Sequence, residues 1–177
     1  KATNGDFVIA LNIVDDVIAK SPKNAEAWKL KGDILLLGKN QVGDAVADYG
    51  KSVEFNPDFL AGHAALITAL LRQGNLTDAD KQLASLKKIA PNQLQTKYLE
   101  AQLAFEKKDF KSARDLTQQI LAAAPANIQT LQLAGAIELQ LNALPAAQDY
   151  LSRAVQAAPN LALARRLLVV TYLRSGQ

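Results

Sequence analysis

Hydrophobic side chains recur along this chain with the spacing of amphipathic helices, and the helices themselves repeat. Residues 94–125 contain two such stretches separated by the polar turn Lys107-Lys108-Asp109. Apolar residues three and four positions apart mark the buried face of a helix. Each copy of the unit ends in a proline that lies 34 or 35 residues from the previous one: Pro22, Pro57, Pro91, Pro125 and Pro159. A period near 34 indicates an array of helical hairpins.

The prolines divide the chain into complete and partial repeats. We predict complete repeats over residues 25–57, 60–91, 94–125 and 128–159, the second half of a repeat over 1–22, and the first helix of a further repeat over 162–177. We assign the single 35-residue spacing to an extra residue in the turn Gly38-Lys39-Asn40-Gln41. We also predict a turn at Gly5-Asp6-Phe7 before a helix that runs to Lys20. The 177 residues are thus interpreted as one array, a fragment of a longer protein.

Superimposing the repeats gives columns of equivalent positions. One column is entirely alanine, and a small side chain there lets two helix backbones approach closely: Ala10, Ala45, Ala79, Ala113 and Ala147. A second column is apolar and is predicted to face the core: Leu30, Ala65, Leu99, Leu133 and Leu167. The helix at residues 7–20 has its own predicted buried stripe, which consists of Phe7, Ala10, Leu11, Val14, Val17 and Ile18.

A third column precedes each second helix and consists mostly of Gly and Asn: Gly5, Asn40, Gly74, Lys108, Asn142 and Gly176. Both residue types adopt the left-handed conformation that ends a helix at little cost. Pro145 falls at the predicted start of a second helix, where its missing N–H removes no hydrogen bond.

These columns resemble the tetratricopeptide repeat (TPR). The second repeat carries the family pattern most fully, with Trp28, Gly32, Leu35, Ala45, Tyr49, Ser52 and Pro57. The chain departs from the pattern where His63, Lys97 and Arg165 replace Trp. The resemblance implies an all-α, right-handed α-solenoid of antiparallel helix pairs, in which the first helix of each pair lines a concave groove.

The later repeats are similar to a narrower group, the TPR-repeat lipoproteins of the bacterial PEP-CTERM/exosortase system. The stretches that carry this resemblance are residues 133–141 and 164–177. It implies a role in exopolysaccharide export or protein sorting. It also implies an exported location, periplasmic or anchored to the outer membrane through a lipid outside this fragment; a cytoplasmic location stays open.

The implied groove has a polar, amide-rich centre. Amides pair with a peptide backbone or with sugar hydroxyls, and aromatic rings anchor apolar groups or stack on sugars. A hydrated groove whose aromatic rings pack on the next repeat is the plain alternative. The predicted partner-binding residues are Lys29, Asp33, Leu36, Thr68, Leu71, Gln95, Tyr98, Gln102, Phe105, Gln129, Gln132, Leu139 and Arg166.

Composition gives no support to catalysis. The chain has no Cys and one His, His63, which excludes the usual zinc cluster and the His-based triads. We expect no cofactor or metal. The net charge of +3 comes from residues 91–177, with nine basic and six acidic side chains. Either a solvated helix face or a binding surface for an acidic partner explains this excess of basic side chains. A nucleic-acid partner is not expected, because a dense basic stripe is missing. No apolar run reaches the 18 residues of a membrane span.

Together these features predict a non-catalytic scaffold that binds a partner peptide or protein in the concave groove. Two alternatives stay open. One is a scaffold that contacts polysaccharide, and the other is the regulatory TPR region of an enzyme whose catalytic domain lies outside this fragment. Apolar faces at the two ends of the array also predict self-association through residues 7–18 or 162–173.

Overall fold

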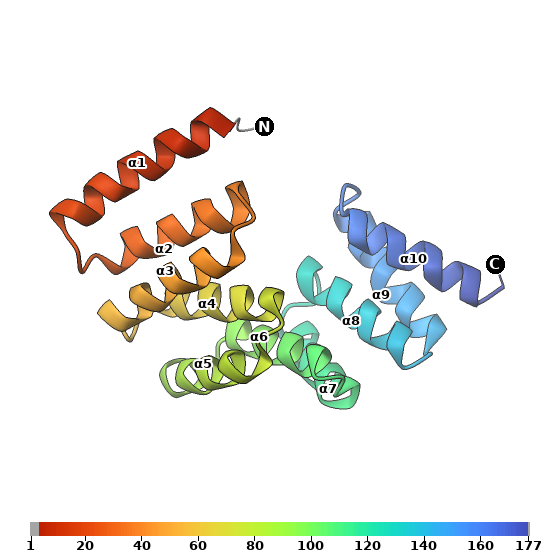
Figure 1. Cartoon of the computed structure of the whole chain (residues 1–177). Coiled ribbons are helices and arrows are strands. Elements are labelled where there is room, and N and C mark those ends of the chain that lie inside the picture. Colours follow the sequence, from red (N-terminus) through yellow and green to blue (C-terminus); the bar gives the residue numbers. More distant parts are fainter. Residues whose placement is uncertain (1–3, 177) are drawn as a thin grey trace. The chain divides into compact units, whose positions relative to one another are not determined.

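The computed structural model describes residues 4–176, which form helices and short turns with no strand among them (Figure 1). The prediction of an all-α solenoid built from helix pairs is confirmed. In chain order the helices are α1 (Asn4–Lys20), α2 (Ala25–Asp33) with a π-helical turn η1 (Ile34–Gly38), α3 (Val42–Phe55), α4 (Leu60–Gln73), α5 (Leu76–Ile89), α6 (Leu94–Glu106), α7 (Phe110–Ala123), α8 (Ile128–Gln140), α9 (Leu144–Ala157) and α10 (Ala162–Arg174).

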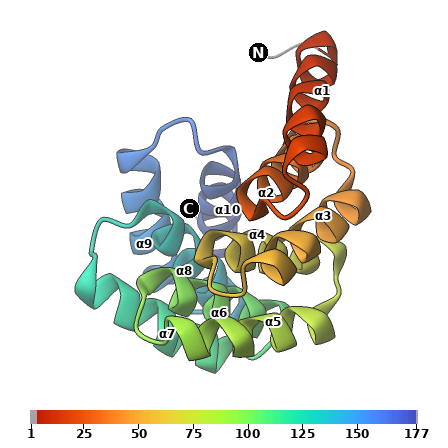
Figure 2. The same cartoon turned by 90° about the vertical axis from the view of Figure 1, so that its left-hand side faces the viewer.

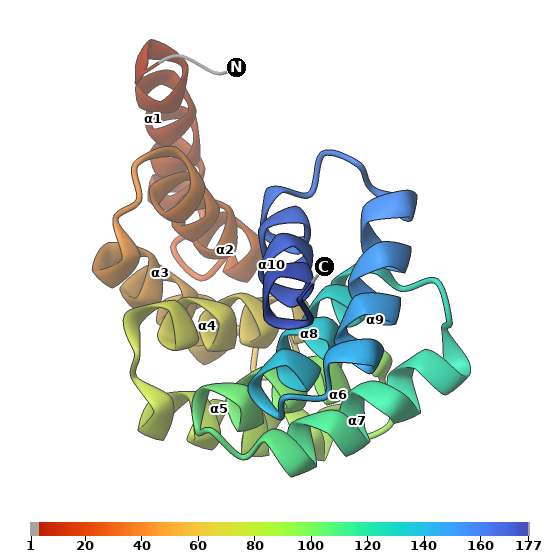
Figure 3. The ribbon, with the colours of Figure 1, turned by 90° about the vertical axis from the view of Figure 1, so that its right-hand side faces the viewer.

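The chain divides into two compact units, residues 1–92 and 93–177. The first unit contains α1 to α5, and the second contains α6 to α10; Figures 2 and 3 show them from opposite sides. Within each unit, consecutive helices pack in pairs, α2 with α3 and α4 with α5, then α6 with α7 and α8 with α9. A first helix also touches the first helix of the next repeat, as α2 touches α4 and α8 touches α10.

Short polar side chains determine where several helices begin. Asn24 Oδ1 accepts a 3.0 Å hydrogen bond from the N–H of Ala27, and Asn127 accepts the equivalent bond from Thr130. Asn75 and Asp109 do the same for α5 and α7. Such caps give a hydrogen-bond partner to N–H groups that have none inside the helix. Each cap stabilises the protein by about 1 kcal/mol.

Five of the six predicted left-handed positions have a positive φ; the exception is Gly5, which lies inside helix α1. Asn40, Gly74, Asn142 and Gly176 all have φ between 55° and 77°. Lys108 has φ of 62° although it is neither Gly nor Asn. Its Cβ therefore lies close to the following carbonyl group, and this conformation costs a side-chain-bearing residue about 1–2 kcal/mol.

The predicted turn at Gly5-Asp6-Phe7 is wrong. α1 is continuous from Asn4 to Lys20, so these three residues are helical. A single glycine inside a helix costs only about 1 kcal/mol, and Asp6 in the first turn favours the helix through its attraction to the positive N-terminal end. The sequence pattern also predicts the frayed end of a helix over residues 1–4. Asn4 is instead the first residue of α1, and residues 1–3 lie outside the described residues.

The extra residue of the second repeat is also not in the turn to which we assigned it. In the other turns the N–H that follows the left-handed residue bonds the carbonyl five positions back, as Asn75 bonds Leu70 at 2.9 Å. Gln41 instead bonds Leu35, six positions back, at 2.9 Å. The additional residue is absorbed by the π-helical turn Ile34–Gly38, the usual way in which a helix takes up one inserted residue.

Close contact between the two helices of a repeat depends on small side chains. Ala45, Ala79, Ala113 and Ala147 are fully buried, as the alanine column predicts. A Cβ added to Gly32 would lie 2.6 Å from the ring of Tyr49, and one added to Gly135 would lie 2.4 Å from Leu151 Cγ. The glycine of the first helix thus provides the space that the large residue of the second helix fills.

Two core predictions fail in the first unit. Leu30 is 51% exposed, whereas Leu99 in the same column is buried. Val17, predicted on the buried stripe of α1, is 40% exposed, whereas its equivalents Ser52 and Leu86 are buried. The common reason is that, among the described residues, no first-type helix precedes α1 to cover these positions.

The packing of α8 on α9 gives a stability prediction. We expect Gly135→Ala to lower the free energy of unfolding by about 1–3 kcal/mol, because Leu151 is buried and has no space into which to move. Gly50→Ala is the matched control, since an added Cβ there meets nothing within 4 Å; we expect it to raise stability by up to about 1 kcal/mol. Urea unfolding followed by circular dichroism measures both. Equal effects of the two substitutions would contradict the proposed close approach.

The strained turn at Lys108 gives a second stability prediction. Lys108→Gly should raise the free energy of unfolding by about 1 kcal/mol, because glycine adopts a positive φ without a Cβ clash. Lys111→Gly, in the first turn of α7, should instead lower it by up to about 1 kcal/mol. Calorimetric melting temperatures compare the two variants. A loss of stability in Lys108→Gly would show that the turn is not strained.

Candidate functional site

In the first unit, two of the predicted groove residues already form a charged pair. Lys29 Nζ lies 2.7 Å from Asp33 Oδ2, one helical turn further along α2. The hydroxyl of Tyr49 donates a 2.9 Å hydrogen bond to the other carboxylate oxygen of Asp33. Burial, followed by the bond to Asp33, raises the pKa of the Tyr49 phenol above its ordinary value of 10.0. The carboxylate is therefore held in place from both sides.

The other predicted residues of this unit differ in accessibility. Leu36 is buried, so it offers no surface to a partner in this structure. Thr68 is exposed, and its hydroxyl donates to the carbonyl of Ala64 at 2.8 Å, within its own helix. Leu71 is half-buried at the end of α4.

In the second unit, α6 carries the predicted amide and aromatic residues. Gln95 is exposed, and Tyr98 and Gln102 are half-buried one turn apart. Gln102 Nε2 donates a long hydrogen bond of 3.4 Å to the Tyr98 hydroxyl. Burial raises the pKa of the Tyr98 phenol. The phenol hydroxyl can both donate and accept a hydrogen bond. Phe105 packs edge-on against Phe110, with ring centroids 5.5 Å apart, so part of its ring serves the core.

Helices α8 and α10 supply the remaining predicted residues. Gln129 and Arg166 are exposed. Gln132 is half-buried, and its amide oxygen Oε1 is buried without a hydrogen-bond partner among the described residues. A buried acceptor left unpaired costs about 1–3 kcal/mol. Leu139 is buried and, like Leu36, is not available to a partner.

The sequence analysis missed one polar link between repeats. Arg114 of α7 forms a two-bonded ion pair with the buried carboxylate of Glu138 on α8, with one N–O distance of 2.8 Å. This bonding raises the pKa of the Arg114 guanidinium. The available signal was Glu138 itself, an acid at a position where the resembled pattern has Tyr.

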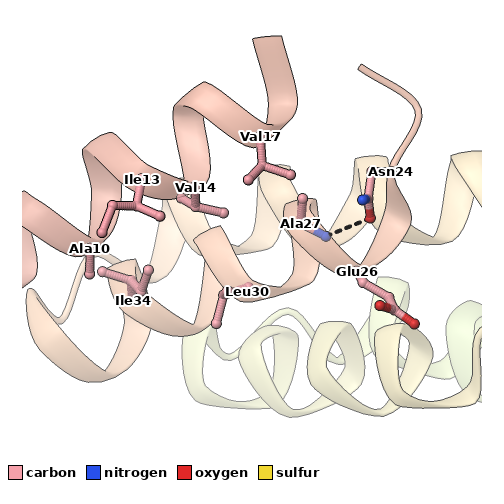
Figure 4. Close-up of a pocket in the computed structure, with 9 residues that line it drawn as sticks. All are labelled: Ala10, Ile13, Val14, Val17, Asn24, Glu26, Ala27, Leu30 and Ile34. Carbon is pink, nitrogen blue, oxygen red and sulfur yellow. Dashed lines mark hydrogen bonds between the residues drawn. The ribbon is translucent and has the colours of Figure 1, made fainter. Parts of the chain in front are cut away.

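A groove between α1 and α2 was also missed. It is a cavity of about 480 Å³ with mostly apolar walls, and Figure 4 shows the side chains that line it. The signal was the apolar stripe of α1, which the sequence analysis took to be covered. The lining residues are Ala10, Ile13, Val14 and Val17 of α1, Asn24 at the cap, Glu26, Ala27 and Leu30 of α2, and Ile34 of η1.

Comparison with known proteins identifies the family to which this chain belongs. The sequence model of the Tetratricopeptide repeat family matches residues 1–58 and 64–128, together more than half of the chain. The chain belongs to the tetratricopeptide repeat family. The TPR array is similar to the solved structure of TTC0263, described as a thermophilic TPR protein of Thermus thermophilus. Sequence identity is 19%, the match covers 96% of this chain and 92% of that one, and the TM-score is 0.77.

Two further structures show the range of proteins with this fold. The array resembles YrrB, described as a TPR protein with an unusual peptide-binding site, at 15% identity and a TM-score of 0.62, with 92% of this chain and 84% of that chain covered. It also resembles the human IFIT1 dimer solved with m7Gppp-AAAA, at 16% identity and a TM-score of 0.81, with 99% of this chain and 44% of that chain covered. At these identities the similarity shows the fold.

The TPR fold is typical of scaffolds for protein–protein interaction.

The single histidine of the chain has a structural role. His63 is buried, and its Nε2 lies 2.8 Å from the carbonyl oxygen of Pro57. Trp28 makes the same bond, from its indole N–H to the carbonyl of Pro22 at 2.7 Å. His63 therefore replaces the family tryptophan with a ring that donates to the same carbonyl.

Over residues 4–176, no group of three His, Cys, Asp or Glu side chains lies together as a metal ion requires. None of the helices in that range has the length and hydropathy needed to cross a membrane.

The Asp33–Tyr49 bond gives a prediction for this site. Tyr49→Phe should lower the free energy of unfolding by about 1–2 kcal/mol at neutral pH, because it removes a hydrogen bond to a charged group while the ring still fills the space beside Gly32. The folded-state pKa of Tyr49 is raised, so its contribution is complete below pH 10 and declines as the pH rises above it. The gap between wild type and variant should therefore narrow in alkaline solution.

Tyr172→Phe in α10 is the control for that comparison, because no hydrogen bond of its hydroxyl is found among the described residues. We expect a change of less than about 0.5 kcal/mol. Chemical denaturation at pH 7 and pH 11 measures all three proteins. A gap between wild type and Tyr49→Phe that is constant over this range would contradict the assigned bond.

Proposed function

We propose that this protein is a non-catalytic scaffold that binds an extended segment of a partner protein along the first helices of the second unit. The polar and aromatic side chains of α6 and α8 form the centre of the binding surface. Gln95, Tyr98, Gln102, Gln129 and Gln132 belong to this surface, and exposed Arg166 extends it along α10. Lys29, Asp33, Thr68 and Leu71 are the corresponding candidates in the first unit.

The observation that supports this proposal most strongly is the unpaired amide oxygen of Gln132. The oxygen has no donor among the described residues. A partner's backbone N–H supplies the missing donor once the half-buried side chain turns outward, and the amide N–H₂ can donate to a backbone carbonyl in return. An extended peptide presents both groups in alternation along its length.

Tyr98 contributes a different kind of contact. Its ring is half-buried, so it is held by the fold, and among the described residues its hydroxyl accepts one long bond, from Gln102. A rigid ring with an accessible hydroxyl provides apolar contact area and a hydrogen bond at low entropy cost, which is why tyrosine is frequent among binding hot spots. The charge of this surface is low, so recognition would rest on shape and hydrogen bonds rather than on steering by charge.

The system in which the scaffold acts is part of the proposal. The resemblance of residues 133–141 and 164–177 to TPR-repeat lipoproteins supports a place in a bacterial PEP-CTERM system, beyond the cytoplasmic membrane. Cell fractionation of the full-length protein tests this compartment. Recovery in the cytoplasmic fraction alone would contradict it and would leave the peptide-binding proposal intact.

Panning a display library of random linear peptides against the 177-residue chain tests the binding surface. We expect enriched peptides whose affinity, measured by calorimetry, falls about tenfold or more in Tyr98→Ala and by at least about threefold in Gln132→Ala. Gln118→Ala is the matched control, because Gln118 is an exposed glutamine on the second-type helix α7, and it should change the affinity by less than about twofold.

Two results would contradict the proposal. One is a set of enriched peptides whose binding is unaffected by both Tyr98→Ala and Gln132→Ala. The other is the absence of any enriched peptide together with binding of a polysaccharide on a glycan array that Tyr98→Ala abolishes, which would favour the scaffold for exopolysaccharide.

A further inference from the structure

Arg166 of α10 is the charged residue of the proposed binding surface in the second unit. The residues that α6 and α8 contribute to this surface are four glutamines and one tyrosine. The Arg166 side chain is exposed, and no carboxylate pairs with it among the described residues. α10 carries three arginines and no acid, and Asp149, which precedes it on α9, is paired with Arg153 at 3.2 Å. The guanidinium of Arg166 is therefore available to another molecule.

The first unit shows how the chain neutralises a charge at the same helix position. Lys29 is the fifth residue of α2, as Arg166 is the fifth residue of α10. Lys29 is paired with Asp33, one helical turn further along, at 2.7 Å. On α10 the residue one turn further along is Val170. This difference lies within a single helix, so it holds whatever precedes or follows that helix in the array.

The exposure of Arg166 is also a property of its position. Lys29, Tyr98 and Gln132 are the fifth residues of α2, α6 and α8, and all three are half-buried. Each of these helices has the next first helix packed beside it, which is α4, α8 and α10 respectively. A side chain at this position thus keeps part of its surface accessible even when a neighbouring first helix follows.

The surroundings of Arg166 on α10 are apolar. Leu163 and Val170 lie three positions before it and four positions after it, on the same face of the helix, and are 49% and 36% exposed. Gln95 and Gln129 hold the place of Leu163 in α6 and α8 and are exposed as well. An ion pair that forms beside apolar groups, and is covered by a bound chain, is less screened by water than a pair on an open polar surface.

We propose that Arg166 binds the carboxylate of an acidic side chain, Asp or Glu, in the partner segment. The inference rests on the proposed function, because it requires the segment to cross α6, α8 and α10. A guanidinium can hold a carboxylate through two parallel hydrogen bonds. One such pair fixes the register of the bound segment, whereas the uncharged residues of α6 and α8 contact its backbone and apolar side chains. Because Arg166 is exposed, a side-chain carboxylate reaches it while the segment continues across the helix.

The packing of the first helices sets the distance between this acid and the residue that contacts Tyr98. Tyr98 is the fifth residue of α6, and α8 packs against both α6 and α10. Packed helices lie about 8–10 Å apart, so two steps from α6 to α10 span about 16–20 Å. An extended chain rises about 3.3 Å per residue. The acid is therefore expected about five or six residues from the apolar residue on Tyr98.

Charge exchange between the protein and its peptide tests the proposal. The probes are linear peptides enriched by panning on the 177-residue chain, resynthesised with an amidated C-terminus so that they carry no terminal carboxylate. We expect an Asp or Glu at the predicted distance from an apolar residue. Its replacement by Asn or Gln should lower the affinity, measured by calorimetry, about tenfold, because a hydrogen-bonded charge pair is lost.

Reversal of the charge of Arg166 gives the complementary measurement. Arg166→Glu should lower the affinity for the acidic peptides about tenfold or more. The same variant should bind the peptides again when Lys replaces their acid, and this recovery also shows that the variant is folded. Arg165→Glu is the matched control, because Arg165 is an exposed arginine on the same helix, turned by about 100° from Arg166. It should change the affinity by less than about twofold.

Three outcomes would overturn the inference and leave the proposed function intact, provided that binding still depends on Tyr98 and Gln132. The first is a set of peptides whose acids can be replaced without loss of affinity. The second is binding that requires a free C-terminal carboxylate. The third is an equal loss of affinity in Arg166→Glu and Arg165→Glu. Absence of any peptide that binds the chain would instead contradict the proposed function, and this inference with it.

Discussion

The fold depends on how closely the two helices of a repeat can approach. Wherever that approach is seen in detail, a small residue on one helix meets a large one on the other. Gly32 lies against the ring of Tyr49, Gly135 lies against Leu151, and the alanines that open the second helices are fully buried. Interiors of proteins are packed as densely as organic crystals, so one added methyl group is felt. The alanine column is the part of this fit that recurs in every complete repeat, with the period of about 34 residues.

The same constraint explains which parts of the fold could be predicted from the sequence. The alanine column and the left-handed positions are local requirements that recur in each repeat. A prediction made for one repeat can therefore be checked against the same position in the others. The extra residue of the second repeat has no second copy. Counting shows that it exists, but the choice between a longer turn and a π-helical turn depends on hydrogen bonds, such as that from Gln41 to Leu35. α1 was misread for a related reason, because Gly5 was interpreted by analogy with glycines that end a helix.

The candidate site was less accessible to prediction. Its residues were predicted from the face of the helix on which they lie. The boundary of that face can be predicted only to within about one residue in each helical turn. Leu36 and Leu139 lie at the edge of that face and are buried, whereas Tyr98 and Gln102 remain half-exposed. Exposure at Leu30 and Val17 depended on a neighbouring helix, which is a property of the array and not of the residue. Sequence columns assume that every repeat has the same neighbours, and this assumption fails first at the ends.

Polar contacts add a second level of organisation, because several of them connect one repeat with the next. Lys31 of α2 bonds Asp15 of α1 at 2.7 Å, Arg72 of α4 bonds Asn40 at 2.6 Å, and Arg114 of α7 pairs with Glu138 of α8. The apolar fit inside a repeat can form with the repeat alone, but these bonds require the neighbour to be in place. In an array whose stability is a sum of repeat and interface terms, they contribute to the interface term.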